Sequence, residues 1–223
     1  MEDKPLVDWA WIGDHLDDVV VRLFQHLQLT AIPVALGFVI SLGLAIWAIR
    51  RPIVYGPTTA ITGLLYTIPS IAAFAFLRPI FGLSLLTAII PLTTYTLLIL
   101  FRSNVSGFQS VPADVLEAAE GMGYTRRERL RRVELPLAIP LMITGIRLAS
   151  VTTVGLATVA AILGDSFGGL GQFITEGLQT FFPTKIYLGA VLSVALAFSL
   201  DILFVRIELW ATPWARARAE QTA

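Results

Sequence analysis

The sequence predicts an all-α integral membrane protein with about five transmembrane helices. Of its 223 residues, 56% are hydrophobic and 14% are charged, and the mean hydropathy is +0.75. Soluble domains average about 45–50% apolar and about 25% charged residues. Several stretches also reach the roughly 20 apolar residues that a helix needs to cross a bilayer. We therefore expect one multi-pass domain embedded in lipid.

Composition and missing motifs exclude several classes of function. The formal net charge is zero and no basic tail is present, so no nucleic acid partner is expected. The chain has no cysteine, which excludes disulfides, thiolate metal sites and a cysteine nucleophile. No GxxxxGK[ST] motif, catalytic triad or metal-ligand cluster occurs, so the chain is expected to hold neither ATP nor a metal and to catalyse no reaction. His15 and His26 are expected at the surface or at an interface.

Residues 1–26 predict an amphipathic segment at the membrane surface. Asp14, Asp17 and Asp18 fall on one side of a helix over residues 9–27. The other side carries apolar residues at spacings of three and four, namely Ile12, Leu16, Val19, Leu23 and Leu27. We expect an interfacial anchor for the first span; a contact surface for an external partner is the alternative.

Five apolar stretches within residues 27–205 form the predicted transmembrane domain. They cover approximately residues 27–49, 57–77, 80–101, 137–163 and 186–205. The spans contain helix-bending prolines (Pro33, Pro69, Pro91 and Pro140) and small residues that allow close helix packing (Gly37, Gly43, Gly63, Gly145 and Gly155). Bent helices of this kind suit a bundle around a pathway, although they also suit an inert bundle.

Two ionisable residues lie in the spans, Arg147 in the fourth and Asp201 near the inner end of the fifth. Intramembrane charge is costly and by default marks a functional site. The alternative is that both side chains reach the cytoplasmic interface or pair inside the bundle. For Asp201, which lies close to Arg206, we favour that alternative.

The segment 164–184 between the fourth and fifth spans is rich in glycine and phenylalanine. Gly168, Gly169 and Gly171 break the helix, and a short amphipathic helix on the outer face is expected to follow. The segment lacks the residues of a phosphate-binding loop. An external gate, a platform for a partner and a plain connecting loop all remain open.

The distribution of arginine and lysine predicts the orientation. If the 102–136 loop is cytoplasmic, eleven basic residues lie inside, namely Arg50, Arg51, Arg102, Arg126, Arg127, Arg129, Arg131, Arg132, Arg206, Arg216 and Arg218. Those that fall outside are Lys4, Arg22, Arg78 and Lys185. By the positive-inside rule the N-terminus is then outside, and residues 206–223 form a cytoplasmic tail.

The 102–136 loop predicts two short helices joined by a sharp turn. Pro112 suits a helix start, and Gly123 suits a left-handed C-cap. Thr125 and Glu128 have the spacing of a capping box that opens the second helix, which should end at about Leu135 before Pro136 starts the fourth span. Attraction to anionic lipid explains the arginines. It does not explain Ala118 and Ala119 or the glycine turn, which describe a rigid elbow offered to a protein groove.

The same loop resembles the EAA loop of the permease subunits of ABC importers. That pattern is EAA, three residues, glycine, nine residues, an aliphatic residue, one residue, leucine and proline. Every anchor is present: Glu117, Ala118, Ala119, Gly123, Val133, Leu135 and Pro136. The wider sequence, including YTIPSIAAFAFL and GIRLASVTTVGLATVAAILG, is similar to the permeases of glycine betaine, choline and carnitine importers.

The resemblance implies a subunit of the cytoplasmic membrane of a bacterium or archaeon that forms the translocation pathway for a quaternary ammonium osmoprotectant. It implies two cytoplasmic ABC ATPase subunits, a second permease copy (identical or a close paralogue) and an extracellular substrate-binding protein. Residues 112–123 would be the coupling helix. No cofactor would bind this chain, because ATP and Mg²⁺ would belong to the ATPase.

Three alternatives remain. The solute could be another small molecule, such as an amino acid, phosphate or a sulfonate, because the loop pattern is shared by those importers. The chain could be a stand-alone secondary transporter, which would function without an ATPase and would favour repeated halves with broken helices. It could also be an assembly factor, in which case Arg147 and the prolines of the bundle could be replaced without loss of function.

Overall fold

The computed structural model describes residues 6–161 and 167–213, and every regular element in these ranges is a helix. Three of the basic residues used to predict the orientation lie outside the described residues, namely Lys4, Arg216 and Arg218. The last two residues of the expected fourth span and the first three of the 164–184 segment also lie outside them. The all-helical prediction is confirmed.

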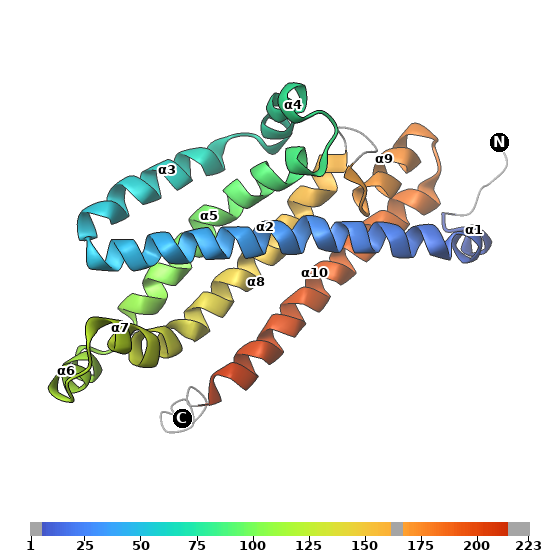
Figure 1. Ribbon diagram of the computed structural model, residues 1–223. Helices are drawn as coiled ribbons and strands as arrows, with labels where there is room; N and C mark the ends of the chain where they lie inside the picture. Colours follow the sequence, from blue (N-terminus) through green and yellow to red (C-terminus); the bar gives the residue numbers. More distant parts are fainter. Residues whose placement is uncertain (1–5, 162–166, 214–223) are drawn as a thin grey trace.

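Four long helices form the body of the molecule (Figure 1): α2 (Leu16–Arg50), α5 (Leu85–Gln109), α8 (Leu135–Ala160) and α10 (Pro183–Ala211). Each belongs to a helical run long and apolar enough to cross a membrane. α2, α5 and α8 pack against one another, and α10 packs on α8. Figure 1 shows the end of α2, the end of α5 and the end of α10 on the same side as the start of α8, as expected for spans that alternate in direction.

The expected second span is interrupted. After a short 3-10 turn, η1 (Pro52–Val54), helix α3 (Tyr55–Thr67) meets α4 (Ser70–Phe81) at an angle of 89°. Ile68, which precedes Pro69, has the extended backbone that a following proline favours. The Tyr95 hydroxyl of α5 donates a hydrogen bond of 2.7 Å to the Ile68 carbonyl freed at the break. The described residues thus contain four spans, or five if the bent pair counts as one.

Small residues bring the central helices together at two of the expected positions. A Cβ added to Gly37 of α2 would lie 1.9 Å from Thr96 Oγ1 of α5, and one added to Gly145 of α8 would lie 2.4 Å from Ser103 Cβ of α5. Gly43, Gly63 and Gly155 have open space beside them. Close approach of backbones therefore explains two of the five glycines.

The N-terminal segment, expected as one helix over residues 9–27, is broken at His15 between α1 (Trp9–Asp14) and the helix of the first span. After this break, helix α2 runs through residue 26, where we expected a boundary. The Trp11 ring makes edge contacts with Phe173 and Phe182, so this segment packs on the protein as well as facing outward.

His26 corrects a prediction, because it is fully buried in the interior. Its Nε2 lies 3.1 Å from the Val154 carbonyl oxygen of α8, and its Nδ1 accepts a hydrogen bond of 3.2 Å from the Leu170 amide. These two bonds together require the neutral imidazole protonated at Nε2. The side chain thereby ties α2 to α8 and to the segment before α9 (Gly171–Gln179).

Candidate functional site: an elbow at the end of the bundle

The charged loop folds as a helical elbow, with α6 (Ala113–Gly121) followed by a turn and α7 (Arg126–Arg129). Gly123 has a φ of +80°, in the left-handed region. The Gly123 amide bonds to the Glu120 carbonyl at 2.9 Å, and the Tyr124 amide bonds to the Ala119 carbonyl at 3.1 Å. These two bonds form a Schellman motif, so the predicted glycine C-cap is confirmed.

The second arm of the elbow begins with the predicted capping box. Thr125 Oγ1 accepts from the Glu128 amide, and the Glu128 carboxylate accepts from the Thr125 amide at 3.0 Å. Both ends of the turn are therefore fixed by local hydrogen bonds. The connection between the two helices is short, and these hydrogen bonds hold its backbone in one conformation.

The elbow is continuous with α8, which differs from our expectation of a helix end near Leu135. α7 passes into a π-helical segment, η2 (Leu130–Glu134), and then into α8, so that one helical run covers Arg126–Ala160. The Leu135 amide bonds five residues back, to Leu130. A π segment before Pro136 relieves the clash that a proline ring makes with the carbonyl four residues earlier in an α-helix.

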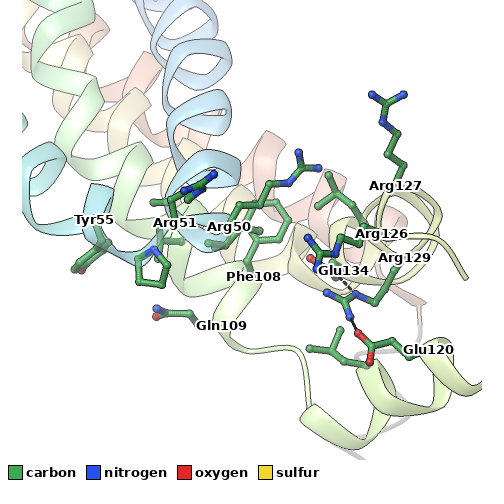
Figure 2. Close-up of a pocket in the computed structure, with 16 residues that line it drawn as sticks. Arg50, Arg51, Tyr55, Phe108, Gln109, Glu120, Arg126, Arg127, Arg129 and Glu134 are labelled. Atoms are coloured by element: carbon green, nitrogen blue, oxygen red, sulfur yellow. Dashed lines mark hydrogen bonds and ion pairs between the residues drawn. The ribbon is translucent and has the colours of Figure 1, made fainter.

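Arg129 clamps the two arms of the elbow. Its Nε donates to Glu134 Oε1 at 2.7 Å, and its Nη1 pairs with Glu120 of α6. Figure 2 shows Arg129 between these two carboxylates. Sequence reasoning missed the clamp because Arg129 and Glu134 are five residues apart. That spacing places two side chains together on a π-helix but not on an α-helix.

The residues of the predicted coupling motif divide into an outward set and an inward set. Glu117, Ala118 and Gly123 are exposed, whereas Ala119 is 1% exposed and is packed inside the protein. Val133, Leu135 and Pro136 are half-buried, and Leu135 packs on the core cluster that contains Ala138 and Phe108. The outward set is free for a partner, while the inward set joins the elbow to the bundle.

Arg147 and Asp201 come together between α8 and α10. Arg147 Nε and Nη2 donate to the two Asp201 carboxylate oxygens at 2.9 and 3.1 Å. Glu208 Oε2 lies 3.7 Å from Arg147 Nη1. The pairing alternative is therefore correct for both residues, and the partner of Asp201 is Arg147 rather than the nearby Arg206.

A second charged cluster lies at the opposite end of the bundle, and sequence reasoning missed it. Arg22 of α2 bonds to Gln172 at 3.0 Å and to Glu176 of α9 at 2.7 Å, and its guanidinium lies 4.5 Å from the centroid of the Phe173 ring. Lys185 of α10 bonds to Glu176 at 2.7 Å. The expected outer helix exists as α9, and this cluster holds it against two spans.

Glu176 predicts a pH dependence of stability. Burial alone would raise the pKa of Glu176, but hydrogen bonds from Lys185 and Arg22 and their positive charges hold it below its ordinary value of 4.5. A carboxyl with a lowered pKa in the folded state stabilises the protein above that ordinary value, and the contribution disappears as the pH falls through the folded pKa.

Thermal unfolding of wild type and Glu176→Gln between about pH 7 and about pH 3 checks this expectation. The wild type should be the more stable protein at neutral pH, and the difference should shrink on acidification. A difference that stays constant over this range would show that the Glu176 ion pairs do not stabilise the fold.

Comparison with known proteins identifies the family. Residues 23–211 match the family described as "Binding-protein-dependent transport system inner membrane component". The chain belongs to this family. It is therefore a multi-pass protein of the cytoplasmic membrane and a permease component of a binding-protein-dependent transport system.

Several relatives of this permease are osmoprotectant transporters. It is 32% identical to the choline transport system permease protein OpuBB of Bacillus subtilis (strain 168), over 92% of this chain and 93% of that protein. It is 35% identical to the osmoprotectant import permease protein OsmW of Salmonella typhimurium, over 85% and 90% of the two chains. The recognised likeness to osmoprotectant permeases is confirmed.

Solved structures share the architecture. An inward-facing structure of the MetNI methionine ABC transporter superposes with a TM-score of 0.75 at 26% identity, covering 86% of this permease and 95% of that chain. An amino acid ABC transporter structure with histidines has a TM-score of 0.73 at 16% identity, which supports the fold alone.

Proposed function

We propose that this permease forms the translocation pathway of an ATP-driven importer for a quaternary ammonium osmoprotectant, such as glycine betaine, choline or carnitine. The elbow docks on a cytoplasmic ABC ATPase, with Glu117 and Ala118 at the contact and Gly123 setting the angle. A second permease copy completes the pathway, and an extracellular binding protein delivers the solute.

The observation that carries this proposal is the rigid connection between the elbow and the bundle. α6 is fixed to α7 by the Gly123 turn and the Arg129 clamp, and α7 runs into α8 within one helical run. A displacement of α6 is therefore transmitted to a membrane-spanning helix. An elbow that merely attracted lipid would need neither the turn nor the clamp.

The energy for transport comes from the partner in this mechanism. ATP shifts the permease between inward-facing and outward-facing states by binding more tightly to one arrangement of the ATPase subunits, and the elbows pass that preference to the spans. ATP and Mg²⁺ belong to the ATPase, so this chain acts as a non-catalytic subunit.

The arginines of the elbow and the end of α2 lie at one end of the bundle, which supports a cytoplasmic position for this end (Figure 1).

Reconstitution tests the proposal. The permease, its ATPase and its binding protein are placed in liposomes, and uptake of radiolabelled glycine betaine, choline and carnitine is measured with and without ATP. We expect ATP-dependent uptake of at least one of them, with little competition from methionine or histidine. Uptake that proceeds without the ATPase, or competition only by amino acids, would contradict it.

A further inference from the structure

A basic cleft of about 940 Å³ opens beside the elbow. Its walls are the end of α2, the start of α3, the end of α5, and the α6 and α7 arms (Figure 2). Five arginines and two glutamates line it, a net charge of +3. This charge exceeds what the transport mechanism requires, because only Arg129 takes part in holding the elbow.

The positive charge of the cleft is largely uncompensated. Both glutamates, Glu120 and Glu134, are paired with Arg129. The other four arginines, Arg50, Arg51, Arg126 and Arg127, are exposed and have no ion-pair partner within residues 6–161 and 167–213. Figure 2 shows Arg50 and Arg51 on the α2 side of the cleft and Arg126 on the elbow side. Guanidinium groups on facing walls suit an anion with several oxygens, and phosphate fits their forked donors.

We propose that this cleft binds the phosphate of an anionic phospholipid headgroup. The cleft lies between the last turn of α2 and the start of α3, at one end of two apolar helices that are candidates for membrane spans. The side chains of Trp47, Ile53 and Tyr55 at this point are exposed, and aromatic residues of this kind mark the membrane interface. Basic pockets between helix ends are a known mode of headgroup recognition.

The remaining walls of the cleft suit a lipid better than a soluble anion. Apolar side chains, including Ile49, Val105 and Phe108, form part of the lining, and these can contact the glycerol and upper acyl carbons of a lipid. On α6 the residues that line the cleft are Leu116 and Glu120. Of the proposed ATPase contact, Ala118 lies on the opposite side of the helix and Glu117 is not part of the lining. The lipid site is therefore separate from the proposed ATPase contact and does not depend on the identity of the solute.

Native mass spectrometry of the full chain in detergent tests the proposal. Phosphatidylglycerol is titrated in, with phosphatidylcholine of the same acyl chains as the zwitterionic comparison of zero net charge. The cleft variant carries Arg50→Gln, Arg51→Gln and Arg126→Gln. The matched control carries Arg102→Gln, Arg131→Gln and Arg132→Gln, which removes the same charge from exposed positions outside the cleft.

We expect the wild type to retain phosphatidylglycerol in preference to phosphatidylcholine. The cleft variant should bind it at least about tenfold more weakly, and the control variant should change by less than about twofold. Equal weakening in the two variants would overturn the proposal, because it would show diffuse attraction by the whole loop.

Two further arms separate other occupants from lipid. Millimolar inorganic phosphate should not displace the lipid; displacement would reassign the cleft to a free phosphate. The cleft variant should still bind the partner ATPase. Loss of ATPase binding with unchanged lipid binding would mean that the cleft receives an acidic protein surface, and the lipid assignment would be wrong.

Discussion

Replacing Gly123 with valine is expected to abolish ATP-driven uptake while the protein still inserts into the membrane. The residue has a φ of +80°, and a side chain in the left-handed conformation costs about 1–2 kcal/mol. A Cβ at this position would meet nothing within 4 Å, so the cost lies in the backbone and not in a clash. The turn can relieve that strain only by giving up the bonds of the Tyr124 and Gly123 amides, which changes the angle of α6.

Two control substitutions test whether transport depends on the backbone conformation at position 123 or is lost whenever a glycine in the elbow is replaced. Gly123→Asn keeps a residue that tolerates the left-handed region and should retain most of the transport. Gly121→Ala lies in α6 with open space around it and should behave as wild type. Uptake in liposomes that contain the ATPase and binding protein is the measurement. Wild-type uptake by Gly123→Val would show that the turn does not set the coupling geometry.

Replacing Asp201 with leucine is expected to destabilise the bundle more than any single change on its surface. The substitution leaves Arg147 without its bidentate partner between α8 and α10. A charged side chain within a span costs about 2.5–3.5 kcal/mol on insertion scales. We expect a loss near the lower end of that range, because Glu208 remains 3.7 Å from Arg147 Nη1 and offers partial compensation.

The double variant Arg147→Leu with Asp201→Leu provides the control. Removing both charges of this pair leaves only Glu208 without its arginine, and Glu208 lies three residues from the end of α10. The double variant should therefore be more stable than Asp201→Leu alone. Thermal unfolding of the purified proteins in detergent measures the difference. If the stability that the double variant loses relative to the wild type equals the sum of the losses in the two single variants, the two side chains do not interact in the membrane.

Local chemistry explains which parts of the elbow could be predicted from the sequence. The Gly123 cap and the Thr125 capping box depend on residues at most a few positions apart, so their spacing alone specifies them. The long apolar runs likewise identified the spans. The continuation of α7 into α8 was not predicted, because Pro136 suggests a helix start unless the preceding π segment is known.

Other features depend on contacts between distant segments and have no local signature. The buried ring of His26 forms its hydrogen bonds with Val154 and Leu170, which lie more than a hundred positions away in the sequence. The Arg22 cluster likewise joins α2 to α9 across 150 residues or more. The 89° break between α3 and α4 follows from Pro69, but hydropathy reports only that both arms are apolar. The charge and hydropathy of the sequence thus identified these residues and segments but did not predict their contact partners.

Affinity purification of this permease from its native membrane tests the central claim most directly. The full chain is recovered under conditions gentle enough to keep known membrane complexes together, and its partners are identified by mass spectrometry. We predict that a P-loop ATPase is recovered with the wild type, together with a substrate-binding protein when solute is present. Recovery of the permease without any ATPase would contradict the account and would favour a transporter that works alone.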